Sequence, residues 1–476
     1  MVYALILIPL LAAGIAWSIQ PGINRARILP VTGIIHFVLT VASLTKVFCV
    51  SPSAWFRLDP LGGWVLLVVS AVFAMVSFYA PAYLALRPDR NYRIFCVSML
   101  GFLSMASLVA TARHPGVLWV GMEAMTLVTT PLIYYTYNRR SLEATWKYLM
   151  ICSVGMALAL LGTFFIAYAA DLGGMGEPLY FDIMVESANS FPGQWLKAGF
   201  VLLLVGYGTK MGLAPLHTWK PDTYSESPGI VGAVLGAGVT TCAFLCLARM
   251  LAILNAAGEG EFARDILVTM GLLSMSWSFV FMVLQTDIKR LLAYSGVEQA
   301  GILAIGLGIG GSGTNVSLFL VGAYAAVKVA LFLAAGNIQR AFGARTVPEV
   351  SGVIRYLPWT GWLFLASFFA SACSPPFGPF IGAYRLASTS FASGRVLAGG
   401  LFLALLGAIF LASSKIILTV VLGTKGPSPK GTLYGDSIGT VGPIAVALAV
   451  ALLLGVWMPP SFSNLLDHAA TIVRGS

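Results

Sequence analysis

Three charged side chains lie deep inside apolar stretches of the sequence. Lys210 stands in GYGTKMGLAPLHTWKPD, Lys328 stands in YAAVKVALFLAAG, and Glu123 stands in LWVGMEAMTLVTTPL. A charge at hydrocarbon depth costs about 2.5–3.5 kcal/mol, so residues that carry one there usually face a bundle interior and mark a route for ions or protons. These residue types therefore predict proton or ion transfer within a membrane.

Glu123 and Lys210 are predicted to form an ion pair. Opposite charges lower each other's energy, and the proton affinity of each group changes when the pair opens, so such a pair acts as a switch. Thr126 and Thr130 follow Glu123 by three and seven residues and share its helical face. The alternative is that Glu123 only ties two helices together.

Further titratable residues follow Lys210 in the chain. His217 comes seven residues later, and an unperturbed imidazole pKa of about 6.5 suits a proton relay. The alternative is a hydrogen-bonded histidine at the membrane edge. Asp222 and Glu226 lie in the next loop, where they form either a mouth at which protons enter or an ordinary solvated cap.

Polar residues in later spans extend the same pattern. Glu298 follows the polar turn TDIKRLLAYSGVEQ, and Tyr324 lies one helical turn before Lys328. The alternative for Lys328 is a lysine whose stem reaches the membrane interface. For Lys415 the sequence leaves interface contact and participation in transfer equally open. His36 is predicted to be structural.

The composition indicates an integral membrane protein. The 476 residues are 58% hydrophobic and only 10% charged, whereas about a quarter of the residues in a soluble domain are charged. The net charge of +10 is interpreted as a topology signal rather than as a site for nucleic acid. The first 19 residues lack a basic front and a small-residue cleavage site, so they are counted as a span.

Motifs of soluble enzymes and of cofactor sites are absent from the sequence. It contains no P-loop, HExxH or GxSxG motif and no Rossmann glycine pattern that follows a strand, since the GLGIGGSG segment at residues 306–313 ends the tenth apolar run and is expected to form a tight turn. The six cysteines form no CxxC pair and are expected to pack rather than to bind metal or form disulfides. We therefore expect no metal site, no cofactor and no redox site in this chain.

Apolar runs of about 20 residues predict fourteen helical spans. Their approximate bounds are residues 2–19, 28–48, 61–84, 93–112, 115–136, 147–170, 195–216, 229–253, 264–284, 290–310, 316–338, 358–383, 396–422 and 438–458.

Two of the spans are predicted to be broken. Pro215 and the neighbouring glycines interrupt the seventh span, and SPPFGPF interrupts the twelfth. The offset of five spans indicates an inverted repeat that pairs spans 4–8 with spans 9–13. The predicted divisions are residues 1–92 (helices 1–3), 93–253 (first repeat), 264–422 (second repeat) and 423–476 (helix 14 and tail).

Lys and Arg residues indicate the orientation of the spans. With the N-terminus outside, inner loops hold sixteen of them, including Lys220 and Lys289, and outer segments hold nine, including Arg249. Because these residues are enriched on the cytoplasmic side, both termini are predicted to lie outside.

The chain resembles the antiporter-like, proton-translocating membrane subunits of respiratory complex I, Mrp antiporters and group 4 membrane-bound hydrogenases. The resemblance covers most of the chain and is carried by FRLDPLGGWVLLVVS, TKMGLAPLHTWKPDTYSESP, TDIKRLLAYSGVEQAGI and KVALFLAAGNIQ. The compact size and VEQAGI are most similar to the F-type membrane component of hydrogenase-4 or formate hydrogenlyase.

The resemblance implies a fold, a role and partners. The fold is an all-α membrane bundle of about fourteen helices with inverted five-helix repeats, in a bacterial or archaeal cell membrane. The role is proton movement coupled to electron transfer in a peripheral redox arm, beside other membrane subunits. Glu123 and Lys210 carry over as the input pair, and Lys328 carries over as part of the central polar axis.

The sequence departs from the family pattern at three positions. Thr241 stands where many relatives have a lysine, Tyr324 where they have a histidine, and Ala383 where they have a lysine or glutamate. Threonine and tyrosine support a water wire, but alanine does not titrate, so the outer half of the route needs a substitute, which is Glu298, Arg385 or a residue of a neighbouring subunit. The two alternative functions are a Na⁺/H⁺ antiporter module and a structural subunit that has lost transport.

Overall fold

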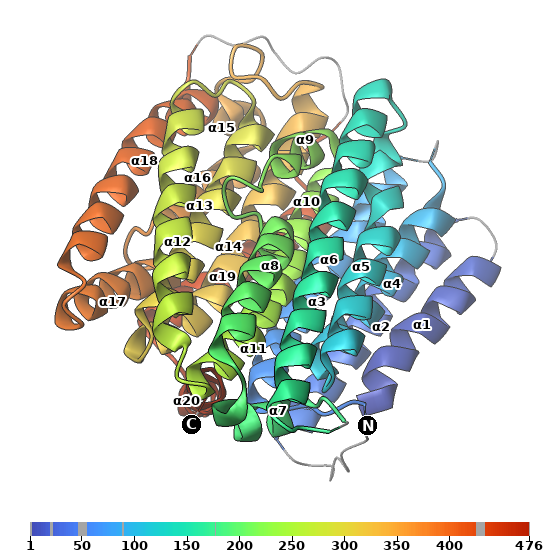
Figure 1. Ribbon diagram of the computed structural model, residues 1–476. Coiled ribbons are helices and arrows are strands. Elements are labelled where there is room, and N and C mark those ends of the chain that lie inside the picture. Colours follow the sequence, from blue (N-terminus) through green and yellow to red (C-terminus); the bar gives the residue numbers. More distant parts are fainter. Residues whose placement is uncertain are drawn as a thin grey trace.

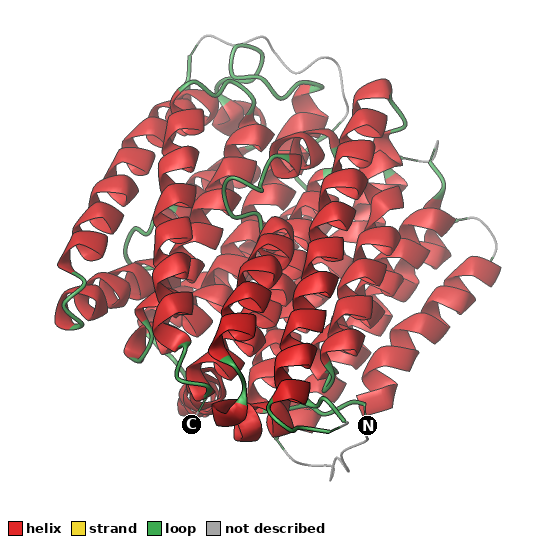
Figure 2. Cartoon of the chain, viewed as in Figure 1, coloured by secondary structure: helices red, strands yellow, loops and turns green. Residues whose placement is uncertain are grey.

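The computed structural model describes residues 2–19, 22–45, 55–87, 90–176, 178–424 and 434–475. Figure 1 shows a bundle of long helices that run roughly side by side. Within the described ranges these helices are joined by loops and no β-strand occurs, as Figure 2 shows. The predicted all-α membrane class is confirmed.

Eleven helical segments in the described part of the chain are long and apolar enough to cross a membrane. They are α2 (Ile23–Leu44), α3 (Pro60–Ala85), α4 (Tyr92–Thr111), α5 (Pro115–Ile133), α6 (Arg139–Leu172), α10 (Gly229–Ala233) continued by η3 (Val234–Val239) and α11 (Thr240–Ala256), α12 (Gly260–Val283), α13 (Ile288–Ile309), α14 (Ser312–Phe342), α18 (Val396–Leu422) and α19 (Ile438–Val456). Together with α1 (Val2–Ser18) and two interrupted spans, they make the predicted fourteen crossings.

The seventh span is interrupted where the sequence predicts a break. Helix α8 (Gly193–Met211) ends at Gly212, which has φ 83° and therefore the left-handed conformation typical of a helix C-terminus. The chain then passes through a turn with a cis Ala214–Pro215 bond into the short helix α9 (Trp219–Glu226). The break leaves backbone carbonyls of α8 available, and the indole of Trp219 donates to one of them, Thr209 O, at 2.8 Å.

The twelfth span is interrupted in the same way. Helix α16 (Pro358–Ser371) ends before the SPPFGPF segment, and α17 (Gly378–Ala392) begins within it. The Pro375–Pro376 bond is cis, and Cys373 has φ 53°. The break thus falls in the fourth span of each predicted five-span unit, while the division of the chain into those units stays a prediction.

The eighth span contains a feature that the sequence did not indicate. Residues Val234–Val239 form a π-helical segment between α10 and α11. Such segments insert one extra residue into a helix and often occur at functional sites. Gly238 in this segment faces Phe102, since a Cβ at this position would lie 2.4 Å from the end of that ring.

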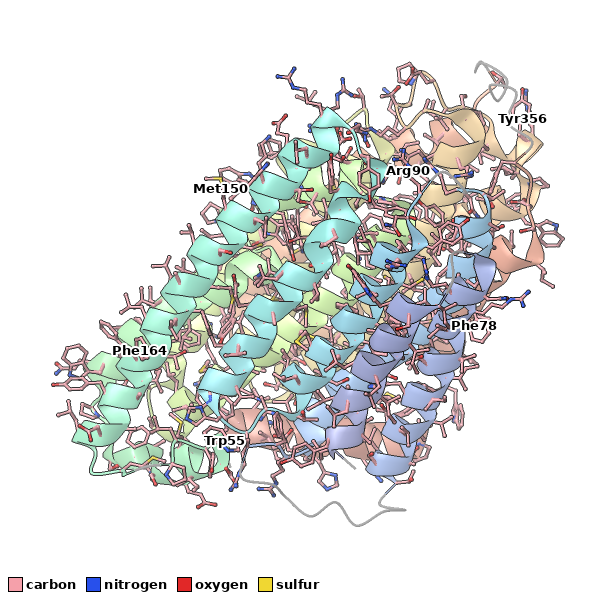
Figure 3. All side chains as sticks on the ribbon, turned by 90° about the vertical axis from the view of Figure 1, so that its right-hand side faces the viewer. Trp55, Phe78, Arg90, Met150, Phe164 and Tyr356 are labelled. Carbon is pink, nitrogen blue, oxygen red and sulfur yellow. The ribbon has the colours of Figure 1, made fainter. Side chains whose placement is uncertain are left out.

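The most buried helices form the centre of the bundle. In α13 and α14 the most apolar 18-residue window is 100% buried, whereas in α18 it is 22% buried. Figure 1 shows α18 at one edge of the bundle and α1 at the opposite edge. Figure 3 shows Met150 and Phe164, which are 65% and 59% exposed, along the outer face of α6. Exposed apolar side chains of this kind fit a surface that faces lipid.

Both chain termini lie at the same end of the bundle (Figure 1). The short helix α7 (Phe181–Ser187) and the final helix α20 (Pro460–Arg474) lie at this end as well. Helix α20, which the sequence treats only as a tail, buries its apolar face (Leu466, Ala469, Ala470 and Val473). It packs against α3, α11 and α14.

Candidate functional site

Lys210 lies in the last turn of α8, at the first break. Its side chain is 1% exposed, and the break allows it to enter the bundle interior. The ammonium donates a hydrogen bond to the hydroxyl of Thr126 on α5 and lies over the ring of Tyr148 on α6, 5.5 Å from the ring centroid. A cation in the last helical turn is also favoured by the helix dipole.

Glu123 shares one face of α5 with Thr126. One carboxylate oxygen, Oε1, accepts a hydrogen bond of 2.9 Å from Ser153 on α6, while Oε2 is buried without a protein partner. Among the described residues Glu123 and Lys210 form no ion pair, because the ammonium is bonded to Thr126 instead. The hydroxyl that binds Lys210 thus lies one helical turn from Glu123 on α5, and the predicted ion pair is not formed in this structure.

Lys328 lies at the centre of α14 and is also 1% exposed. Its ammonium donates to the hydroxyl of Ser295 at 2.5 Å and to the carbonyl of Leu292 at 3.2 Å, both on α13. Glu298 follows Ser295 by one turn on the same helix, is 3% exposed, and acts electrostatically on Lys328. The second deep lysine therefore also combines a hydroxyl partner with a nearby glutamate.

A small cavity adjoins this second group. It has a volume of about 20 Å³, and its lining includes Ser295, Glu298 and Ser371. A cavity needs about 10–15 Å³ measured in this way to hold one water. Water therefore fits beside the carboxylate of Glu298.

Tyr324 connects α14 with the second break. Its hydroxyl lies 3.3 Å from the Sγ atom of Cys373. Gln299 on α13 makes a parallel connection, since its Nε2 donates to the hydroxyl of Ser371 at 3.1 Å. Thr241, in contrast, bonds within its own helix, where its hydroxyl donates to the carbonyl of Ala237 at 2.5 Å.

His217 is buried between α12 and α13. Its ring centroid lies 6.1 Å from those of Trp277 and Tyr294, and its side chain is 2% exposed. Its Nδ1 atom is buried without a protein partner. The histidine is therefore inside the bundle but is not bonded to the deep lysines.

Asp222 and Glu226 lie in a polar cavity of about 370 Å³. Asp222 pairs with Lys147 at 2.9 Å and with Arg290 at 2.5 Å. Glu226 pairs with Arg345 at 2.5 Å. Burial opposes the charge of Arg345, but the hydrogen bond to Glu226 and the negative charges of Asp287 and Glu226 together outweigh burial and raise the pKa of the guanidinium above its ordinary value. Both acidic residues thus stand in a charged, open cavity.

The structure corrects the positions of four basic residues. Lys220 and Lys289 are each 1% exposed, and Arg25 and Arg249 are 2% and 4% exposed, so they do not lie in solvated loops. Arg249 forms an ion pair of 2.6 Å with Asp59, which caps α3. Without the four, inner loops hold thirteen Lys and Arg residues and outer segments eight, so the bias remains.

Two other polar residues stand apart from the buried groups. Lys415 is exposed on α18. His36 is fully buried, and its two ring nitrogens lie 2.8 Å and 2.9 Å from the hydroxyls of Ser70 and Ser107, as suits the predicted structural role.

The cysteines of the described part of the chain are all free. There are five of them, and Cys49 lies outside the described residues. No group of three His, Cys, Asp or Glu side chains within the described ranges could hold a metal ion.

These features define a class of protein: a multi-pass membrane bundle with broken helices that holds ionisable side chains in its interior. The chain belongs to the family described as "NADH:quinone oxidoreductase/Mrp antiporter, TM", which matches residues 112–407. It is an antiporter-like membrane subunit, and the predicted family is confirmed.

Two relatives cover most of the chain. It is 28% identical over 450 residues to the hydrogenase-4 component F homolog of Methylacidiphilum infernorum, which covers 92% of this chain and 93% of that protein. It is 30% identical over 371 residues to NADH-quinone oxidoreductase subunit N of Geobacter metallireducens, covering 77% of this chain and 76% of that protein.

Solved structures share the fold. A chain of an archaeal membrane-bound sulfane sulfur reductase matches with a TM-score of 0.86 at 20% identity, over 99% of this chain and 97% of that chain. A chain of the Mrp complex from a Dietzia species matches with a TM-score of 0.85 at 18% identity, over 99% and 96%. At these identities the matches support the architecture alone.

Proposed function

We propose that this chain is the proton-translocating membrane subunit of a multi-subunit redox complex, in which a peripheral arm carries out electron transfer. One observation supports this most directly: Lys210 and Lys328 are both 1% exposed, each bonded to a hydroxyl that lies one helical turn from a glutamate. Ionisable groups are expensive to bury without use, so their recurrence inside one bundle favours transport over a purely structural role.

The partners are proposed from the names of the relatives. These are a hydrogenase-4 component and a subunit of NADH-quinone oxidoreductase. We infer neighbouring membrane subunits and a redox arm, in a bacterial or archaeal cell membrane with both termini outside. The termini lie at the same end of the bundle (Figure 1), which is consistent with this orientation.

The proposed switch is movement of Lys210 between two partners. Bonded to Thr126, its ammonium lacks an ion-pair partner. Movement toward Glu123 would raise the proton affinity of the amine, and return to Thr126 would lower it. A change of one pKa unit is worth about 1.36 kcal/mol, so a modest movement redirects a proton.

The remaining polar residues extend the proposed route on both sides of the switch. Asp222 and Glu226 form the entry, and His217 relays protons behind them. Lys328 receives the proton, and Glu298 supplies the titratable group that relatives have at the position of Ala383. Thr241 and Tyr324 line the water on this path.

The test is Lys210→Met in the intact complex, purified through a tag on this chain and reconstituted into liposomes. Mass spectrometry of the co-purifying subunits identifies the redox arm and hence the electron donor. Proton uptake is then measured alongside electron transfer, with sodium varied at constant pH. We expect electron transfer with at least tenfold less proton uptake, independent of sodium.

Lys415→Met is the matched control, because it removes a lysine from the exposed face of a span. It should leave uptake unchanged. Undiminished uptake by the Lys210→Met complex would remove Lys210 from the route. Sodium-dependent uptake would instead favour an antiporter module.

A further inference from the structure

Lys220 is buried inside the bundle although it lies in the polar segment after the first break. Its side chain is 1% exposed. Its ammonium donates to the carbonyl of Met211 at 2.6 Å and to that of Gly296 on α13 at 3.4 Å. No carboxylate within the described ranges pairs with it. A buried ammonium held only by neutral carbonyls keeps a high desolvation cost.

Two glycines make room for this side chain. At Gly212 a Cβ would lie 2.4–2.5 Å from the Cδ, Cε and Nζ atoms of Lys220, so the lysine stem passes directly over the glycine. At Gly296 a Cβ would lie 3.8 Å from Nζ of Lys220 and 3.9 Å from Nζ of Lys328. The two ammonium groups are therefore at most about 7.7 Å apart, the sum of these two distances.

Lys220 is also linked to Lys210. The carbonyl that binds its ammonium belongs to Met211, the residue after Lys210. Both ammonium groups act electrostatically on the thiol of Cys152 on α6. Lys220 is thus linked to Lys210 on one side and to Lys328 on the other. The three buried lysines are here called the lysine row.

Aromatic rings accompany the lysine row. Each lysine lies over one ring: Lys210 over Tyr148 at 5.5 Å, Lys220 over Tyr224 at 6.0 Å, and Lys328 over Phe332 at 5.9 Å from the centroid. Trp219 joins the rings, because its centroid lies 5.1 Å from Tyr148 and 6.0 Å from Tyr224, and Tyr224 lies 5.2 Å from Phe332. Ring faces attract cations, so this arrangement stabilises charge at each lysine, including Lys220, which has no carboxylate partner within the described ranges.

We propose that Lys220 is a proton-carrying residue of the same route, which accepts a proton released by Lys210 and passes it to Lys328. This inference rests on the proposed function. In each step an N–H bond of the ammonium breaks and a new N–H bond forms on the neutral amine of the next lysine, with water between them. No electrons move, and the positive charge advances by one lysine.

Three variants of the reconstituted complex test the proposal. Lys220→Met removes the amine. Lys220→Arg keeps a cation and its donors but does not release a proton in proteins. Lys220→His keeps a group that titrates. We expect the Met and Arg variants to assemble and transfer electrons with at least tenfold less proton uptake, and the His variant to recover part of it.

The outcomes separate this proposal from the proposed function. Wild-type uptake per electron in Lys220→Met or Lys220→Arg overturns the inference, and if Lys210→Met still blocks uptake, the proposed function stands. Failure of all three Lys220 variants to assemble also overturns it, since the lysine would then be a structural support of the break. Unchanged uptake in Lys210→Met defeats the proposed function itself.

Discussion

The ammonium of Lys210 donates a hydrogen bond to Thr126, which lies one helical turn from Glu123, and forms no ion pair with that glutamate. Lys328 repeats the arrangement, since it donates to Ser295, one turn from Glu298. A hydroxyl both donates and accepts hydrogen bonds, so it serves an ammonium and a neutral amine alike. This property makes the hydroxyl, rather than the carboxylate, a suitable resting partner for a lysine that changes its protonation state.

Thr126→Val therefore tests the resting partner of Lys210. Valine keeps the shape of threonine but removes the hydroxyl, and a hydrogen bond to a charged group is worth about 1.5–3 kcal/mol. We expect Lys210 to stay near Glu123 and proton uptake per electron to fall about tenfold. The measurement is proton uptake by the reconstituted complex during electron transfer.

Thr130→Val is the control for this change. The hydroxyl of Thr130 donates only to the backbone carbonyl of Thr126, at 2.7 Å. Its loss should leave uptake near the wild-type value. Equal effects of the two substitutions would show that Thr126 acts only through the stability of α5.

Gly296→Ala tests the space between Lys220 and Lys328. The new Cβ would make ordinary contacts at 3.8–3.9 Å, so the complex should assemble normally. It would occupy the position that both ammonium groups face, and we expect at least fivefold less proton uptake per electron. The control is Gly407→Ala, where a Cβ meets nothing within 4 Å. Unchanged uptake in Gly296→Ala would mean that protons do not pass through this space.

The sequence predicts the spans and their breaks well because each depends on local chemistry. Apolar length sets the spans, and Pro215 with Gly212 sets the first break. The depth of Lys210 and Lys328 follows from the apolar residues around them. The hydroxyl that binds each lysine could not be predicted in this way, because it depends on how neighbouring helices are rotated.

Lys220 shows where local chemistry misleads. It stands between two prolines in a polar segment, which is typical of a solvated loop. In the structure this segment forms α9 and packs inside the bundle, with Trp219 and Tyr224 both 0% exposed. The aromatic residues Trp219 and Tyr224 are the sequence signal from which burial could have been inferred.

Asp182 should make the stability of the fold sensitive to acid at the end of the bundle where both termini lie. It accepts hydrogen bonds from Arg113 at 2.7 Å and 3.0 Å and from Arg57 at 3.0 Å. Partial burial favours the neutral acid, but the Arg113 hydrogen bonds and the positive charges of Arg113 and Arg57 together outweigh burial and hold the pKa of Asp182 below its ordinary value. A depressed carboxyl pKa stabilises the fold above the unfolded value of about 3.9, and this stabilisation is lost as pH falls below it.

Asp182→Asn is the matching variant. At pH 7 we expect it to lower the unfolding free energy by about 1 kcal/mol, seen as a lower thermal midpoint in detergent. The difference from wild type should persist to about pH 5 and shrink toward pH 3. Asp265→Asn, which removes a pair whose carboxylate is 59% exposed, should have a smaller effect. A difference that stays constant down to pH 3 would contradict the assignment.

Gly212→Ala tests whether the first break and Lys220 depend on one another. An alanine at φ 83° is strained, and its Cβ would also collide with the stem of Lys220. Gly343→Ala is the control, because Gly343 has φ 66° at the end of α14 but open space around it. We expect Gly343→Ala to cost about 1 kcal/mol of stability and Gly212→Ala to cost more.

In a Lys220→Ala background the excess cost of Gly212→Ala should disappear, giving a coupling of about 0.5–3 kcal/mol in a double-mutant cycle of thermal unfolding. Additive effects of the two substitutions would mean that Lys220 does not lie over Gly212.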